Sequence, residues 1–260
     1  MMTSLDRVVA MPEPLAVPSP PESTTFAEVP IRPAATVIVV RDRVDEHDIE
    51  ALLLRRSAEL VFHGGSWVFP GGRLDPGDYH PERPEDLDHA AAMAAAREAH
   101  EEAAIHIDPA ALLPFSHWTT PPGRPRRFAT WFFLAALVGE AAQLDVTVDG
   151  SEINDHLWVT PQEAMAAHAS GSVELPAPTF VSLTRLSRYR SVAELVTGVP
   201  TEPYRRFNPQ VVNVAGEWVA TLYDGDAAFG LDPIDLHAPG PRHRIWLNEL
   251  PWRYELSDLD

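Results

Sequence analysis

The stretch from Gly71 to Ile105 constrains what this chain can fold into more than any other part of its sequence. It begins with a pair of glycines and ends in an alanine-rich run, which favours a helix because alanine loses no side-chain entropy there. Within that run Glu98, Glu101 and Glu102 stand at positions i, i+3 and i+4. A helix therefore places their carboxylates together on one face.

Carboxylates crowded on one face repel one another, and a divalent cation with oxygen ligands removes that repulsion. Mg²⁺ and Mn²⁺ suit such ligands, and glycine at Gly72 would let the backbone approach the same ion closely. Arg97, four residues before Glu101, can hold that carboxylate in place. The alternative is a solvated acidic helix face, which is what most charge runs are. These residues alone leave both interpretations open.

The order of these residues resembles the Nudix box. Gly72 is followed by five residues and the acid Asp78, and later by Arg97-Glu98, Glu101-Glu102 and Ile105. The preceding Phe69-Pro70-Gly71 is also typical of that family. The resemblance implies an α/β fold of the Nudix type, an α/β/α sandwich with a mixed β-sheet, here with a C-terminal extension.

Three features depart from the family pattern. Asp78 stands where the family has glutamate, and Ala104 replaces a closing glycine that we expect to be left-handed, at a cost of about 1 kcal/mol. Eighteen residues, Tyr79 to Ala96, separate Asp78 from Arg97, where the family has a shorter spacer. We predict that this insertion is a lengthened loop. None of these departures removes an expected metal ligand.

The resemblance implies a hydrolase that cleaves a diphosphate bond in a nucleoside diphosphate linked to another moiety. It implies Mg²⁺ or Mn²⁺ bound by Glu98, Glu101, Glu102 and the backbone near Gly72. One of the glutamates would take a proton from the attacking water, and Arg97 would complete the catalytic set by orienting carboxylates. Two other classes stay open: a non-catalytic nucleotide-binding regulatory module, and a structural protein that a metal ion stabilises.

A second resemblance narrows the substrate. Residues 52–72 partly match a signature found upstream of the box in coenzyme A diphosphatases, through Arg56, Ser57 and Gly65. Leu54 and Val61 depart from it, and packing of a strand and a turn would explain the match equally well. With the inserted box and the extension, it favours hydrolysis of coenzyme A or acyl-CoA to 3′,5′-ADP and (acyl-)phosphopantetheine. ADP-ribose, NADH, a nucleotide sugar and an oxidised nucleotide are the alternatives.

Arginines are the candidate substrate-binding residues, because their guanidinium groups bind phosphates bidentately. Arg56 belongs to the upstream signature, and Arg124, Arg126 and Arg127 lie close together in a predicted hairpin loop. Arg205 and Arg206 are further candidates for a 3′-phosphate. The alternative for the loop is a solvated segment that offsets acidic surroundings.

Composition excludes several classes of protein. Cysteine and lysine are both absent, which excludes disulfides, thiolate nucleophiles, P-loop lysines and Schiff-base chemistry. The formal charge of −18 argues against binding nucleic acid or an anionic membrane. Without a long apolar run or a signal-peptide pattern, we expect a cytoplasmic protein whose partner is a small nucleotide. Whether it forms a homodimer stays open.

The rest of the chain divides into three parts. We predict a disordered, proline-rich arm over residues 1–30, the Nudix domain over 31–200, and an extension over 201–260 packed on it. Predicted strands cover residues 34–40, 50–56, 112–120, 127–138, 243–247 and 252–256, with a hairpin over 210–223. Thr160 and Glu163 predict a capping box, although Glu163 could also be a base. One amphipathic helix is predicted over residues 176–197, in which Phe180 or Tyr189 packs in the core or stacks on adenine.

Overall fold

The computed structural model describes residues 29–44, 48–57, 65–143, 145–148 and 150–257, so nearly all of the predicted arm lies outside the described residues. A mixed sheet of eight strands has the order β3-β2-β1-β6-β5-β8, with β4 also paired to β1 and β7 to β2. Its strands are β1 (Ile31–Asp42), β2 (Ile49–Arg56), β3 (Trp67–Val68), β4 (Gly71–Arg73), β5 (Leu113–Thr119), β6 (Arg127–Leu137), β7 (Ile153–Val159) and β8 (Arg205–Phe207).

The centre of the sheet is the parallel pair β1 and β6. Residues Val37 to Val40 of β1 are fully buried, so both faces of that strand are covered. A run of β-branched residues suits such a position because it packs well on a pleated surface from either side. The strands predicted at 34–40, 50–56, 112–120 and 127–138 are thereby confirmed.

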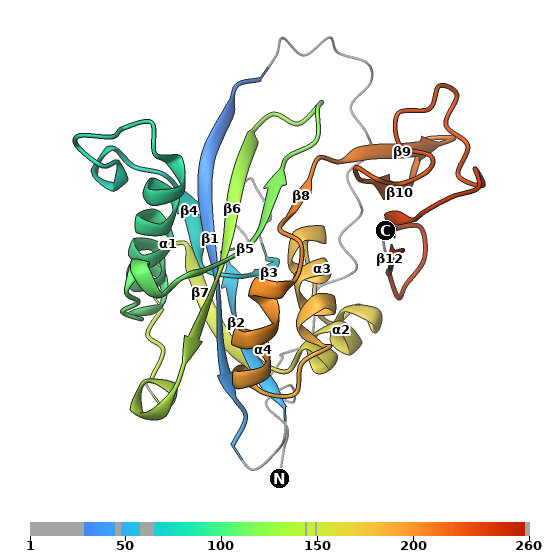
Figure 1. The fold of residues 1–260 in the computed structure, drawn as a ribbon. Coiled ribbons are helices and arrows are strands. Elements are labelled where there is room, and N and C mark those ends of the chain that lie inside the picture. Colours follow the sequence, from blue (N-terminus) through green and yellow to red (C-terminus); the bar gives the residue numbers. More distant parts are fainter. Residues whose placement is uncertain (1–28, 45–47, 58–64, 144, 149, 258–260) are drawn as a thin grey trace.

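Helices cover both faces of the sheet (Figure 1). On one face α1 (Leu87–Ala103) packs its buried alanines against β1 and β6. On the other face lie α2 (Pro161–Ala169), α3 (Ala177–Leu186) and α4 (Val192–Gly198). The predicted α/β/α sandwich is confirmed. At the start of α2, Thr160 and Glu163 form the predicted capping box, and Glu163 also pairs with Arg43 at 3.0 Å.

The prediction of one helix over residues 176–197 is wrong. The helix ends at Leu186, and Ser191 starts α4 by accepting a hydrogen bond from the backbone N–H of Glu194. A serine hydroxyl makes this cap at a helix start, which a pattern of apolar residues does not reveal. Phe180 is buried in the core, and the hydroxyl of Tyr189 donates to Glu202 at 2.7 Å.

Two expectations around the box also need correction. The glycine turn at Gly71 is part of strand β4, which pairs antiparallel with β1. The insertion is only partly a loop: α1 begins at Leu87, so residues 87–96 extend the helix that carries the glutamates. Alanine's helix propensity explains this outcome, since six of those ten residues are alanines: Ala90, Ala91, Ala92, Ala94, Ala95 and Ala96.

The end of the chain forms a second, antiparallel sheet in the order β12-β11-β10-β9. Its strands are β9 (Gln210–Val214), β10 (Glu217–Leu222), β11 (His243–Trp246) and β12 (Arg253–Leu256), which confirms the hairpin and both strands predicted there. Tyr223, Ile245 and Trp252 join the core under α2 and α3. Within the described part of the chain, no helix combines the length and apolarity needed to cross a bilayer.

Candidate functional site

The glutamates of α1 lie against the glycines of β4. The backbone N–H of Gly71 donates to Glu102 Oε2 at 2.9 Å. A Cβ atom at Gly72 would overlap the carboxylate of Glu98. A side chain at position 72 would displace the end of the flexible Glu98 side chain, so glycine lets that carboxylate lie against the strand. That the backbone at Gly72 approaches a metal ion stays a prediction, and the group that the structure places against Gly72 is the carboxylate of Glu98.

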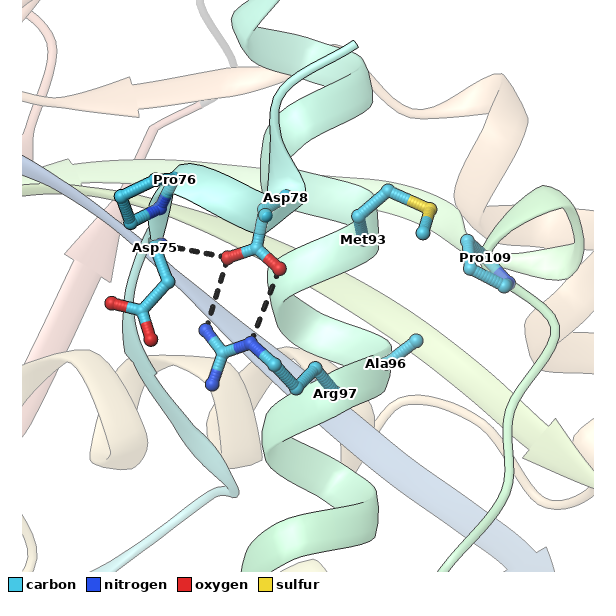
Figure 2. Close-up of a pocket in the computed structure, with 8 residues that line it drawn as sticks. Asp75, Pro76, Asp78, Met93, Ala96, Arg97 and Pro109 are labelled. Carbon is cyan, nitrogen blue, oxygen red and sulfur yellow. Dashed lines mark hydrogen bonds and ion pairs between the residues drawn. The ribbon is translucent and has the colours of Figure 1, made fainter. Parts of the chain in front are cut away.

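Arg97 connects the acidic residues of this site. Its Nε and Nη2 donate to the two carboxylate oxygens of Asp78 at 3.1 and 3.0 Å, the bidentate contact drawn in Figure 2. Its Nη1 donates to Glu98 Oε1 and to Glu101 Oε2, both at 2.9 Å. Its Nη2 also donates to the carbonyl of Arg73 at 3.0 Å. All the N–H groups of this guanidinium are thus engaged, and Arg97 orients carboxylates as predicted.

The bond to Asp78 is the feature that the sequence did not reveal. Asp78 is 5% exposed, and its other partner is the backbone N–H of Asp75 at 2.7 Å. The signal was present, because an acid and an arginine flank the insertion at residues 79–96. The sequence could not show that the chain folds back after the insertion, so that the side chains of Asp78 and Arg97 come into contact.

Burial opposes the ionisation of two glutamates at this site. Burial, with a further contribution from Glu98, raises the pKa of Glu102 to about 8, although the N–H of Gly71 opposes this. Burial also raises the pKa of Glu98, against the opposing charge of Arg97. The hydrogen bond to Asp78 is the main cause that raises the pKa of Arg97 above its usual value. A buried carboxyl group, Glu102, and a half-buried one, Glu98, that both resist ionisation are a suitable environment for a positive ion.

No three acidic or histidine side chains among the described residues converge closely enough to bind a metal ion as they lie. Arg97 holds Glu98 and Glu101, and Gly71 holds Glu102. The chemistry of the donors nevertheless fits a hard divalent cation: three carboxylates on one helix face beside a glycine strand. His100, the histidine inside the box, stacks on His106 with ring centroids 4.0 Å apart.

The predicted substrate-binding arginines do not lie together. Arg56 is at the end of β2, and its charge lowers the pKa of Glu102. Its Nε is buried without a hydrogen-bond partner among the described residues, and its Nη2 lies 3.9 Å from Glu152. Residues 58–64 of the upstream signature, Val61 included, lie outside the described residues.

The arginines of the β5–β6 loop are directed elsewhere. The guanidinium of Arg124 lies over the ring of Trp218 in the C-terminal sheet, 4.3 Å from its centroid. Arg127 Nε donates to the carbonyl of Thr120 at 3.1 Å, and Arg126 is exposed. At the far edge of the sheet, Arg206 is exposed and lies over the ring of Tyr204. Of the predicted substrate-binding arginines, Arg56 is therefore the one whose charge acts on Glu102.

Comparison with known proteins places this geometry in a family. The family model described as the NUDIX domain matches residues 30–176, which is more than half of the chain. Acyl-coenzyme A diphosphatase NUDT19 of Xenopus laevis is 32% identical over 130 residues, 47% of this chain and 33% of that protein. Its human counterpart is 31% identical over 124 residues, 46% of this chain and 32% of that protein. The alignment thus spans about a third of the length of these relatives.

Two further proteins are similar over a longer span. Putative nudix hydrolase 7 of Caenorhabditis elegans is 26% identical over 226 residues, 72% of each chain. The crystal structure of a Nudix hydrolase from Alicyclobacillus acidocaldarius has a TM-score of 0.59 and 26% identity, covering 68% of this chain and all of that one. With its domain matched and the glutamates of its box gathered on α1, this chain belongs to the Nudix hydrolase family.

Proposed function

We propose that this Nudix hydrolase cleaves the diphosphate bond of coenzyme A or acyl-CoA, giving 3′,5′-ADP and (acyl-)phosphopantetheine. The observation that carries the proposal is the set of three box carboxylates held on α1 against the glycines of β4. The support for the substrate comes from the acyl-coenzyme A diphosphatases that are 32% and 31% identical to this chain over 130 and 124 residues. The inserted box and the partial upstream signature at Arg56 and Ser57 favour the same substrate.

Glu98, Glu101 and Glu102 would hold the divalent ion, with the backbone at Gly72 beside them. Such an ion, when bound, neutralises diphosphate charge and makes a water molecule more acidic. Arg97 keeps its bidentate bond to Asp78 and so fixes the helix face on which Glu98 and Glu101 stand. One of the three carboxylates accepts the proton that water loses as its oxygen attacks phosphorus. The P–O bond to the leaving phosphate then breaks.

Coenzyme A carries a 3′-phosphate in addition to its diphosphate, so its binding requires a cation beyond the metal site. We assign this role to Arg56. Its charge acts on Glu102, and its buried Nε has no hydrogen-bond partner among the described residues. The side chain of Arg56 is partly exposed, and a guanidinium group can bind a phosphate oxygen by charge-assisted hydrogen bonds.

A panel of diphosphates tests the proposal. The purified protein, with Mg²⁺ or Mn²⁺, is incubated with coenzyme A, dephospho-coenzyme A, ADP-ribose, NADH and a nucleotide sugar, and the products are identified by mass spectrometry. The proposal predicts 3′,5′-ADP from coenzyme A, a lower kcat/KM for dephospho-coenzyme A, and no product when EDTA is present. Cleavage of ADP-ribose or a nucleotide sugar but not of coenzyme A would overturn the substrate. Binding without any turnover would favour the regulatory module instead.

A further inference from the structure

A hollow of about 450 Å³ lies between the turn that joins β5 to β6 and the C-terminal sheet. Prolines dominate its lining, so it is called here the proline hollow. The lining residues come from three segments of the chain: Pro121, Pro122, Pro209, Gln210, Val211, Phe229 and Gly230. Val211 and Phe229 are only half-buried, so apolar surface is left open to solvent. Apolar surface gathered in this way marks a place of contact.

The beginning of β1 is close to the proline hollow, and both lie in the upper part of Figure 1. Ile31 pairs with Arg127 of β6. On the other side of β6, Thr120 at the start of the turn exchanges hydrogen bonds with Phe128. Two strand spacings, about 10 Å, therefore separate the start of β1 from the start of the turn. The chain that precedes β1 thus enters the fold beside the hollow.

The segment that precedes β1 carries a group suited to the hollow. Phe26 is the one aromatic residue before Ile31 and stands five positions ahead of it, outside the described residues. An extended chain spans at most about 3.5 Å per residue, so these five positions reach about 17 Å. That reach exceeds the separation across the two strands. A phenyl ring is a large apolar group, and a hollow lined by prolines and a half-buried aromatic ring accommodates it.

The charges of the segment and of the turn are complementary. Glu22 and Glu28 stand on either side of Phe26 in the sequence. The turn carries Arg124, which is half-buried, and Arg126, which is exposed. In a chain with a formal charge of −18, such a cationic turn attracts an acidic segment that the molecule as a whole repels.

We propose that the proline hollow is the docking site of this chain's own residues 22–28, with the ring of Phe26 in the hollow. The acids of the segment then face the arginines of the turn. This contact connects the beginning of β1 to the C-terminal sheet, and it orders the last part of the arm that the sequence predicts to be disordered. The inference does not depend on which substrate the enzyme cleaves.

Photo-crosslinking in the full chain tests the proposal. The analogue p-benzoylphenylalanine, which keeps the phenyl ring, is incorporated at position 26, and the residues that it labels on irradiation are identified by mass spectrometry. We expect labelling within the same chain at residues 121–122, 209–211 or 229–230. The same analogue at position 15, outside the docking segment, is the control and should not label these residues.

Two variants of the hollow complete the test. Val211→Asp and Pro122→Asp should each lower the crosslinking yield from position 26 about tenfold, because a charge replaces an apolar contact. Pro122 is exposed in the turn, so its variant is informative even if Val211→Asp disturbs β9, and circular dichroism shows whether each variant is folded. Val214→Asp is the matched control, because Val214 is also on β9 and is 55% exposed but does not line the hollow. Its yield should equal that of the wild type.

Three results would overturn the proposal. Position 26 could label other parts of the chain, or label the hollow no more strongly than position 15 does. Val211→Asp and Pro122→Asp could crosslink as well as Val214→Asp. Crosslinks could also join two chains, seen as a band of dimer mass on a denaturing gel, and the occupant of the hollow would then be a second copy.

Discussion

At the scale of single residues, the site depends on contacts between backbone and carboxylate. Glu102 accepts from Gly71, and Glu98 occupies the space that a side chain at Gly72 would fill. Arg97 then fixes the remaining acids by bonds to Asp78 and Glu101. The glycines leave room for the carboxylates of Glu98 and Glu102 beside the strand. Because water is largely excluded there, a carboxylate that loses its hydrogen-bond partner is costly.

Gly72→Ala is therefore predicted to damage the site without unfolding the chain. The added methyl group overlaps the carboxylate of Glu98, and moving it should lower kcat by roughly tenfold or more, as seen when groups that support a metal ligand are lost. Gly77→Ala is the control, because a Cβ there meets no atom within 4 Å. For both variants, steady-state kinetics measure kcat, and circular dichroism shows whether the protein is folded. Equal activity of the two variants would refute the role given to Gly72.

At the scale of elements, α1 shows how far the sequence predicts this structure. The spacing of the glutamates predicts their common face, and the alanines predict the helix. The pairing of Gly72 with Ala35 of β1, and the bond from Arg97 to Asp78, depend on contacts between distant segments. No local pattern encodes such contacts, so sequence alone named the acidic residues of the site without showing these two contacts. The break between α3 and α4 was not predicted either, because the start of α4 depends on one hydrogen bond to the hydroxyl of Ser191.

The end of α1 gives a stability prediction. Ala104 has φ 56° and caps the helix by donating to the carbonyl of His100. An L-residue with a Cβ is disfavoured there, so Ala104→Gly should stabilise the protein by about 1 kcal/mol. For a chain of this size that corresponds to an increase in Tm of about 2–4 °C. Ala92→Gly, in the middle of the same helix, should lower Tm instead. A fall in Tm for Ala104→Gly would contradict the strain inferred at this cap.

At the scale of the whole molecule, the C-terminal sheet is joined to the sandwich through buried aromatic and histidine rings. His168 of α2 packs edge-on against Trp252, with centroids 4.5 Å apart, and His243 of β11 lies against Phe207 and Tyr223. Trp118 and Phe207 stack beneath them at 3.8 Å. The extension thus shares its apolar contacts with the main core, and we propose that the two fold as one unit.

These histidines predict a loss of stability in acid. Burial lowers the pKa of both His168 and His243 below the ordinary value of 6.5. The unfolded chain therefore binds more protons than the folded one, and stability falls as the pH falls from about 6.5 towards the folded-state pKa values. Tm measured at pH 7.5 and pH 5.5 should fall less in His168→Gln and His243→Gln than in the wild type. His237→Gln, at an exposed position, is the control and should match the wild type.

The central claim is that the carboxylate face of α1 carries metal-dependent hydrolysis. Glu102→Gln tests it most directly, because glutamine can still accept from Gly71 and resembles the protonated carboxyl that a pKa of about 8 favours at neutral pH. The measurement is kcat for coenzyme A with Mg²⁺, compared with Glu217→Gln, the same change at an exposed position of β10. We predict that Glu102→Gln keeps its Tm and loses activity by about 100-fold or more, as expected for a metal ligand. An unchanged kcat in Glu102→Gln would contradict the account.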